Sequence, residues 1–323
     1  MKLKFDSTLS YQLEAIKSVT DLFEGQPASS SGFQIDFGKG GSMYNDLGIG
    51  NDLALSGELI VQNLHAVQSR NNVPKSRLLQ EGGAAYDFPN FSVEMETGTG
   101  KTYVYLRSIF ELNKLYGFKK FIIVVPSVAI REGVTSSIKL MRDHFRGLYN
   151  NVAFDHFVYQ SKDLSRVRQF AVNNEIQIMV INIQAFQKDA GENVDYASLT
   201  DEQKKRLNVI HQEQDRMSGR RPIEYVQATR PILIIDEPQS VDNTEKSQKA
   251  IRNLQPLFCL RYSATHSNPY NLLYQLDPVR AYDLRLVKQI EVIDASGSQD
   301  YNQTFVRLDA VGYWPKTAKT PQA

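Results

Sequence analysis

The sequence predicts an α/β protein with a mostly parallel sheet, helices on both faces of it, and irregular insertions. From residue 88 to residue 263, short apolar runs alternate with amphipathic segments long enough for helices, which is typical of such a sheet. The runs FIIVV and ILII are apolar at every position, as expected of strands buried on both sides. The chain has 323 residues, 41% of them hydrophobic and 23% charged, so it can form a substantial core and is neither disordered nor fibrous.

The N-terminal part combines helices with irregular chain. Residues 8–25 carry apolar side chains at helical spacing, with Ser7 as the expected N-cap and Gly25 at the end. Residues 27–51 are rich in Gly, Ser and Asn and predict an irregular segment, followed by a second helix at about 56–68. We therefore expect an insertion over about 26–87, before the alternating pattern begins.

The alternating part supplies the predicted sheet. Its expected strands cover residues 90–94, 121–125, 152–158, 176–181, 231–235 and 257–263. Its expected helices cover residues 102–116, 129–145, 164–173 and 246–253. A polar interruption at about 187–230, with a solvated helix at 199–214, predicts a second, surface insertion. Two further strands are expected at 288–293 and 304–313.

Composition excludes several classes of function. The net charge is +1, from 37 basic and 36 acidic residues, so the overall charge favours neither nucleic acid nor an anionic membrane as a partner. Cys259 is the single cysteine, which excludes a disulfide framework, and the five histidines form no H-x-x-x-H pair of a zinc site. No apolar stretch approaches the ~20 residues of a membrane-spanning helix. We expect a cytoplasmic protein with no membrane partner.

A Gly-rich turn between a predicted strand and a predicted helix is the first sign of chemistry. In METGTGKT, the two glycines free successive backbone N–H groups to surround a phosphate. Lys101 would supply charge for the β- and γ-phosphates, and the Thr102 hydroxyl would ligate Mg²⁺. The candidate phosphate-binding residues are Gly98, Thr99, Gly100, Lys101 and Thr102. The complete pattern has Gly where this chain has Met95, so a turn with an incidental lysine stays the alternative for this motif alone.

A pair of carboxylates follows another predicted strand. Asp236 and Glu237 come directly after ILII, at the strand end where open α/β sheets bind ligands. Asp236 is placed to hold Mg²⁺, and Glu237 to orient and deprotonate an attacking water. A solvent-facing turn is the alternative. Taken together, the two motifs predict ATP and Mg²⁺ as cofactors, with Lys101, Asp236 and Glu237 as the catalytic residues.

A third short motif, Ser263-Ala264-Thr265, follows the next apolar run. Small hydroxyl side chains at that strand end can hydrogen-bond to the carboxylates and relay the state of the nucleotide to a neighbouring domain. We assign Gln239, Ser263 and Thr265 to this coupling. Because Ser and Thr are common at strand ends, the assignment depends on the order of the three motifs and their spacing.

The three motifs, in this order, resemble the first ATPase domain of a superfamily 2 helicase or translocase, a RecA-like P-loop domain. More narrowly, METGTGKTYVYLR, VVPSVAIREGV, RPILIIDEPQSV and the run from SATHS to YDLRLVKQIEV resemble the Res subunit of type III restriction–modification enzymes. The phosphate loop of that family typically lacks the first glycine, which accounts for Met95. The resemblance is densest from about residue 88 to residue 292.

The resemblance implies further site residues and partners. Gln12 matches the glutamine that reads the adenine edge in such motors, with an exposed helix glutamine as the alternative. The segments that contact nucleic acid match Pro126, Ser127, Arg131, Asn182 and Gln184, and for both of these segments a polar loop without a ligand is the alternative. The family also implies double-stranded DNA as the track, a modification methyltransferase (Mod) as partner, and cleavage by a nuclease domain.

Half of such a motor is missing from the sequence. No second ATPase unit, later arginine motif or nuclease motif follows the three motifs. We expect residues 1–290 to form the first ATPase domain and residues 291–323 the truncated start of a following segment. We therefore expect the N-terminal piece of a longer protein, which would bind Mg-ATP weakly and hydrolyse it slowly or not at all.

Other interpretations stay open. One is a superfamily 2 helicase of another type, acting on RNA or on repair intermediates. A second, from a non-enzyme class, is a nucleotide-binding or docking module that does not hydrolyse ATP and whose insertions are docking surfaces. A third is a metabolic P-loop kinase, which gives no reason for DEPQ followed by SAT.

Overall fold

A seven-stranded parallel sheet forms the centre of the protein. The computed structural model describes residues 4–28, 47–77, 79, 86–191, 194–266 and 269–287. The strands are β1 (Asn90–Met95), β2 (Lys120–Val125), β3 (Phe154–Val158), β4 (Ile176–Asn182), β5 (Ile232–Asp236), β6 (Phe258–Ser263) and β7 (Leu272–Leu276). Their order in the sheet is β3-β4-β2-β5-β6-β1-β7, and every pair of neighbours is parallel. The predicted fold class is confirmed.

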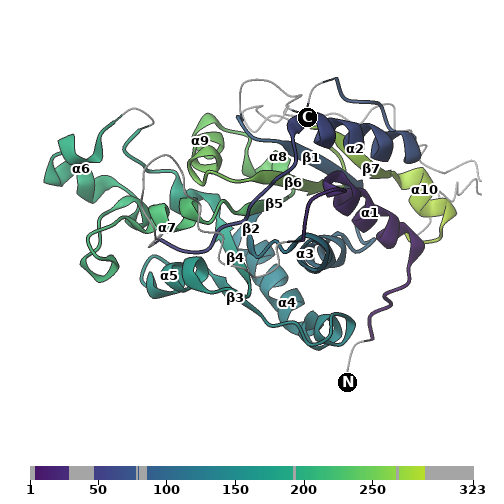
Figure 1. Ribbon diagram of the computed structural model, residues 1–323, viewed down its shortest axis with the longest axis horizontal. Helices are drawn as coiled ribbons and strands as arrows, with labels where there is room; N and C mark the ends of the chain where they lie inside the picture. The colour runs from purple at the N-terminus through teal and green to yellow at the C-terminus, as the bar shows by residue number, and fades with distance from the viewer. Residues whose placement is uncertain are drawn as a thin grey trace, which may run out of the picture. The chain divides into compact units, whose positions relative to one another are not determined.

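Helices cover both faces of this sheet (Figure 1). One face packs against α1 (Ser10–Thr20), α2 (Gly57–Arg70), α3 (Lys101–Tyr116) and α4 (Val128–Leu148). The other face packs against α5 (Ser165–Val172), α7 (Pro222–Ala228), α8 (Pro238–Val241) and α9 (Glu245–Asn253). Each face of the sheet has its own apolar core: the first core lies under α1–α4, and the second lies under α5 and α7–α9. In β2, Ile123 belongs to the first core and Ile122 to the second. Because successive side chains of a strand point to opposite faces, a strand between two cores must be apolar at every position.

The short segment around Asn51 crosses the amino end of the sheet and joins two of its strands, β2 and β5. The Asn51 side-chain amide donates to the carbonyl oxygens of Lys120 (2.9 Å) and Arg230 (3.1 Å). Its carbonyl oxygen accepts from the backbone N–H groups of Lys119 (2.8 Å) and Lys120 (3.2 Å). One buried asparagine thus satisfies backbone groups at the starts of β2 and β5 that would otherwise lack partners.

Several expected elements differ from those observed. The first helix begins at Ser10 with Leu9 as its N-cap, and the carbonyl oxygen of Ser7 instead accepts from Arg107 (2.6 Å), so the predicted Ser7 cap is wrong. The solvated helix expected at 199–214 is reduced to α6 (Asp201–Arg206). That helix buries no side chain, so nothing in the core supports its continuation beyond the first turns.

Three elements were not predicted. The helix α7 lies inside the expected surface insertion, yet Ile223 and Val226 pack into the second core. The strand β7 and the helix α10 (Pro278–Asp283) follow the SAT motif, where the sequence shows only a short, mixed pattern. Short 3₁₀ turns follow α1 and β4 and occur within the segment 187–230. They are η1 (Asp21–Phe23), η2 (Ile183–Phe186), η3 (Tyr196–Ser198), η4 (Val209–His211) and η5 (Asp215–Met217).

Some expectations fall outside the described residues. The strands expected at 288–293 and 304–313 lie there, as do the segment 291–323 and most of the irregular segment 27–51. Among the helices that the structure describes, none has the length and apolar character needed to span a bilayer.

Candidate active site

The order of the strands brings the three motifs to one edge of the sheet. The phosphate loop follows β1, the carboxylate pair ends β5, and the SAT motif ends β6. Because β6 lies between β5 and β1 and all three run in the same direction, the three strand ends are neighbours. This edge is where open parallel sheets hold ligands.

The phosphate loop is a tight turn that leads directly into α3. The Thr99 N–H donates to the carbonyl oxygen of Glu96 (3.2 Å), and Gly98 and Gly100 have φ of 82° and 95°. Only glycine adopts these values at little cost. Met95 is buried in β1 beside Leu276 of β7, so the strand continues through the position where the complete motif has its first glycine.

The helix α1 covers the phosphate loop. The carbonyl oxygen of Thr99 accepts from the Tyr11 hydroxyl (3.1 Å) and from the Gln12 amide (3.1 Å). A Cβ atom on Gly100 would lie 2.5 Å from Nε2 of Gln12, so any larger residue there would have to displace the end of the Gln12 side chain. Gln12 is therefore a buried residue that contacts the loop, rather than an exposed helix glutamine. The sequence pattern did not identify Tyr11 as a partner of the loop.

An ion pair joins the phosphate loop to the carboxylates. Nζ of Lys101 lies 2.9 Å from Oε1 of Glu237, and both side chains are largely removed from solvent. Glu237 has a left-handed backbone with φ of 54°, a conformation uncommon for a side chain of this size. Such strain is typical of functional sites, where it aims a side chain in a required direction.

A small polar network holds the other oxygen of Glu237. The Gln239 amide donates to Oε2 of Glu237 (2.6 Å), and Oγ of Ser263 lies 3.0 Å from the same atom. Oγ of Ser263 also lies 3.1 Å from Oε1 of Gln239 and 2.7 Å from the carbonyl oxygen of Thr265. The structure thus brings the three residues assigned to coupling together around one carboxylate, Thr265 through its backbone.

The two carboxyl groups have pKa values shifted in opposite directions. Burial, and then the charge of Glu237, raise the pKa of Asp236 from 3.8 to about 6. Burial also acts to raise the pKa of Glu237, but hydrogen bonds from Lys101, Gln239 and Ser263 outweigh it and lower that pKa. Two adjacent carboxyl groups whose pKa values are shifted in opposite directions are suited to different chemical roles.

The surroundings of Asp236 fit a magnesium ion. The pKa of the buried Tyr105 hydroxyl is raised by burial and then by the charge of Asp236, whereas Thr102 lowers it, so both side chains lie near this hydroxyl. Among the described residues, no group of three or more His, Cys, Asp or Glu side chains is arranged for a metal. A carboxylate and a hydroxyl still suit Mg²⁺, which keeps several waters and takes further oxygens from phosphates.

A buried glutamate attaches the SAT loop to the strand before the phosphate loop. Oε1 of Glu94 in β1 accepts from the backbone N–H of His266 (2.9 Å) and lies 3.2 Å from Nδ1 of that histidine. Oε2 accepts from the Gln275 amide of β7 (2.7 Å). Burial acts to raise the pKa of Glu94, and the bonds to His266 and Gln275 outweigh it and lower that pKa.

A buried arginine anchors the far end of α8. The guanidinium of Arg261 in β6 lies 2.6 Å from Oδ2 of Asp242 and donates to Asn90 of β1 (2.9 Å). Its planar group faces the rings of Tyr86 and Tyr270, at 5.1 and 4.5 Å from their centres. Arg261 and Ser263 lie on the same face of β6, so this strand contacts both ends of the turn that carries Gln239. A charge inside an apolar strand marks Arg261 as a group that needs a partner, but nothing in the sequence pointed to Asp242 as that partner.

The residues matched to nucleic-acid contacts lie along the neighbouring strand ends. Pro126 and Ser127 follow β2, and the Ser127 hydroxyl caps α4 by accepting from the N–H of Ile130 (3.3 Å). Arg131 lies in the first turn of α4. Asn182 ends β4, with a buried Oδ1 that has no hydrogen-bond partner among the described residues, and Gln184 is exposed in η2.

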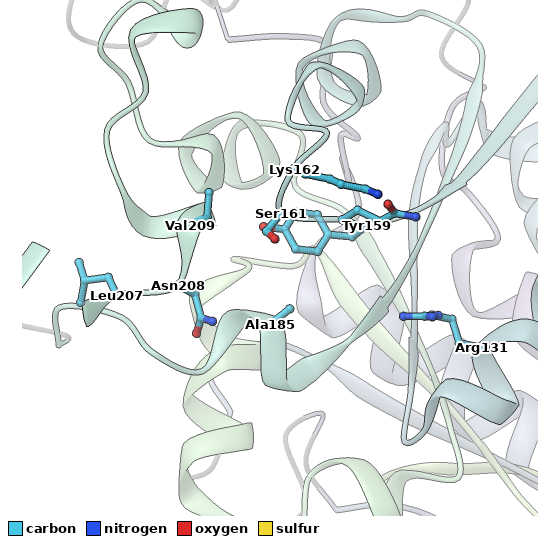
Figure 2. Close-up of a pocket in the computed structure, with 9 residues that line it drawn as sticks. Arg131, Tyr159, Ser161, Lys162, Ala185, Leu207, Asn208 and Val209 are labelled. Carbon is cyan, nitrogen blue, oxygen red and sulfur yellow. The ribbon is translucent and has the colours of Figure 1, made fainter. Parts of the chain in front are cut away.

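Beside Arg131, a cavity of about 520 Å³ opens at the ends of β3 and β4 (Figure 2). It is separate from the residues around Lys101 and Asp236, none of which lines it.

Comparisons with known proteins agree with these motifs. A family model described as "Type III restriction enzyme, res subunit" matches residues 6–268. The EcoP15I Res subunit of Escherichia coli is 30% identical over 256 residues, which cover 74% of this chain and 24% of that protein. The EcoPI Res subunit of Escherichia phage P1 is 27% identical over 298 residues, which cover 88% of this chain and 28% of that protein. The chain spans about a quarter of the length of these relatives.

Among solved structures, the chain is similar to the Sulfolobus solfataricus SWI2/SNF2 ATPase core in complex with dsDNA. The two share 13% sequence identity with a TM-score of 0.34, over 64% of this chain and 31% of that one.

Proposed function

The chain belongs to the family of type III restriction enzyme Res subunits, as a helicase-like ATPase domain, and from this premise we propose that it binds Mg-ATP at the edge formed by β1, β5 and β6. We propose further that ATP hydrolysis there drives movement along double-stranded DNA, leading to DNA cleavage by a nuclease domain. The second ATPase domain and that nuclease domain would be supplied elsewhere in the parent protein, a Mod methyltransferase would be the partner, and the complex would act in the cytoplasm.

The ion pair between Lys101 and Glu237 is the observation that carries this proposal. It connects motifs that lie 136 residues apart in the sequence, at a distance of 2.9 Å. A glycine-rich turn or a strand-end carboxylate alone has many structural explanations. A cation from one and an anion from the other, at the ligand-binding edge of a parallel sheet, match the arrangement that phosphoryl transfer requires.

Each residue of the site then has a role that follows from its surroundings. Lys101 would exchange Glu237 for the phosphates of the nucleotide, and the N–H groups of the Gly98–Gly100 turn would surround them. Asp236 and Thr102 would hold Mg²⁺, which, when bound, neutralises charge on the phosphates. Glu237, released from Lys101, would accept a proton from the attacking water, and Ser263 and Gln239 would keep its carboxylate in place.

Nucleic acid would bind along the next strand ends. The exposed or half-exposed Ser127, Arg131 and Gln184 form a row there, and their hydroxyl, guanidinium and amide groups suit the phosphates of a DNA backbone. Such contacts fix the position of a protein on DNA without reading its sequence, as a motor that moves along DNA requires.

Binding of a fluorescent ATP analogue to three variants tests the site. Lys101→Ala should weaken Mg-dependent binding by at least about tenfold, or ~1.4 kcal/mol, because the phosphates lose their cation. Lys114→Ala, which removes an exposed charge near the other end of α3, should leave binding unchanged. Glu237→Gln should bind at least as well as the natural chain, because Lys101 no longer has a competing anion.

Hydrolysis in a single turnover tests the role of Glu237. Glu237→Gln should bind the nucleotide and fail to hydrolyse it, while any slow hydrolysis by the natural chain should depend on Mg²⁺. Equal hydrolysis rates for the two proteins would rule out Glu237 as the base. If the natural chain shows no Mg-dependent nucleotide binding, the proposed function is wrong. Robust DNA-stimulated turnover would refute the expectation that the chain alone is a weak ATPase.

A further inference from the structure

A cavity on the proposed DNA-binding edge is built partly from the segment 187–230. It has a volume of about 520 Å³, within the range of small-ligand sites. Arg131 lines one side of it and Leu207–Val209 the other, with Tyr159, Ser161 and Ala185 between them (Figure 2). The cavity therefore extends the row of candidate DNA contacts rather than forming a separate part of the surface.

Hydrogen bonds join the wall contributed by the segment 187–230 within itself and to the turn that follows β4. The side-chain oxygen of Asn208 accepts from the N–H of Lys188 (2.7 Å), and its own N–H donates to the Lys188 carbonyl oxygen (2.8 Å). Nε2 of the buried His211 lies 2.9 Å from the carbonyl oxygen of Phe186 in η2. Because the bond from His211 ties this wall to η2, which directly follows β4, the cavity is a feature of the fold.

The charged groups of the cavity favour an anion. Arg131 and Lys162 both line it, and Lys162 is exposed. Across the described part of the chain, Lys162 has no acidic side chain within ion-pair distance, whereas Arg131 pairs with the exposed Glu132 at 3.1 Å. No carboxylate is among the lining residues. An anion entering the cavity would thus meet at least one cation that has no competing partner.

Tyr159 supplies a second sign that points to a ligand. Its side chain is 7% exposed, and its ring packs against Phe186 with 4.9 Å between ring centres. Its buried hydroxyl forms no hydrogen bond with any residue that the structure describes. Burial raises the pKa of this hydroxyl to about 12, so at neutral pH it keeps its proton and can donate it. Burying an unpaired hydroxyl lowers stability, and a phenylalanine would avoid that cost.

We propose that this cavity is a subsite for one phosphate and its sugar in the nucleic-acid strand that crosses Ser127 and Arg131. Lys162 neutralises the phosphate, and the Tyr159 hydroxyl donates to an oxygen of the phosphate or the sugar. The segment 187–230 is then part of the DNA-binding surface, because Leu207–Val209 close the subsite. This inference rests on the proposed function, which supplies the strand, and adds to it a place where the strand is held.

Two variants of the whole chain test the subsite by fluorescence anisotropy with a labelled DNA duplex. Tyr159→Phe should weaken binding by about three- to tenfold, since one hydrogen bond is lost, while its urea unfolding midpoint stays equal or rises. Lys162→Ala should weaken binding and reduce the slope of log affinity against log salt by about 1. Lys114→Ala, with its charge at the opposite edge of the sheet, should change neither property.

The outcomes separate this inference from the proposed function. If the natural chain binds the duplex and both variants bind equally well, the subsite is wrong and the proposed function stands. If the natural chain binds no DNA at any salt concentration, the proposed function fails in its DNA part, and the subsite fails with it. If Tyr159→Phe lowers stability together with affinity, the hydroxyl is structural and the subsite is overturned. The same holds if the variants lose affinity for free Mg-ATP instead of DNA, because the cavity then takes a free nucleotide.

Discussion

Replacing Asp236 by Asn should stabilise the fold and remove Mg-dependent nucleotide binding at the same time. Asp236 is 7% exposed, and burial followed by the charge of Glu237 raises its pKa from 3.8 to about 6, although Lys101 acts in the opposite direction. The folded protein therefore binds the proton of this group more tightly than the unfolded chain does. An asparagine of nearly the same shape carries no charge to bury.

The size of the effect follows from the shift in pKa. A difference of about 2 units corresponds to about 3 kcal/mol of stability, which the natural chain has below the unfolded pKa and loses as the pH rises through 4 to above 6. The variant has no such dependence. We expect Asp236→Asn to exceed the natural chain in free energy of unfolding by about 1.5 kcal/mol near pH ~5 and by about 3 kcal/mol near pH ~8.

Urea unfolding followed by circular dichroism, with a chelator present, measures this difference. Glu202→Gln on the exposed face of α6 serves as the control and should match the natural chain at both pH values. In a second series, Mg-ATP should raise the unfolding midpoint of the natural chain and leave that of Asp236→Asn unchanged. Equal stability of the two proteins near pH ~8, or a difference that does not vary with pH, would refute the reasoning from burial.

Three further predictions concern residues that the tertiary structure singles out. Asn51→Ala should lower the free energy of unfolding by about 2–4 kcal/mol in urea, because backbone groups at the starts of β2 and β5 lose their partner, while nucleotide binding by the folded fraction is retained. Asp242→Ala should cost about 3–5 kcal/mol, since it leaves the Arg261 guanidinium buried without its anion, and a stability loss under ~1 kcal/mol would show that the pair is not desolvated. Gly100→Ala should cost about 1–2 kcal/mol and weaken nucleotide binding, because φ is 95° and the new Cβ would displace Gln12; a calorimetric titration with Mg-ATP that shows unchanged affinity would contradict this.

Much of the fold could be predicted from local patterns. The strands β2, β4 and β5 are apolar at nearly every position, so their burial on both sides was evident before any contact was known. The edge strand β7 was missed because it has only five residues, with Leu273, Tyr274 and Leu276 buried and Leu272 and Gln275 not, so its sequence shows no clear period. The long helix expected at 199–214 was wrong because polarity with some periodicity does not form a helix unless a face is buried.

In the candidate site, some residues could be predicted from short sequence motifs, and others were found only in the structure. Gly98, Lys101, Asp236 and Glu237 were predicted from residue type and position, since a Gly-rich GKT turn and a strand-end carboxylate pair are short local motifs, and the structure brings Lys101 and Glu237 together. Contacts between segments far apart in the chain had no such signal. The hydrogen bonds from Tyr11 and Gln12 to the carbonyl oxygen of Thr99 are one example. The ion pair of Arg261 with Asp242 is another.

By itself the sequence determined the class of fold, the existence of a Gly-rich GKT turn and a strand-end carboxylate pair, and the family to which these motifs belong. Those properties depend on the period of apolar residues and on short runs of adjacent side chains, which folding does not rearrange. The tertiary structure alone decided that β6 lies between β5 and β1, that Lys101 meets Glu237, and that Tyr159 and Asn208 close one cavity. These properties depend on which strands pair and on how buried groups share hydrogen bonds and charge, and such choices are made by the whole folded chain.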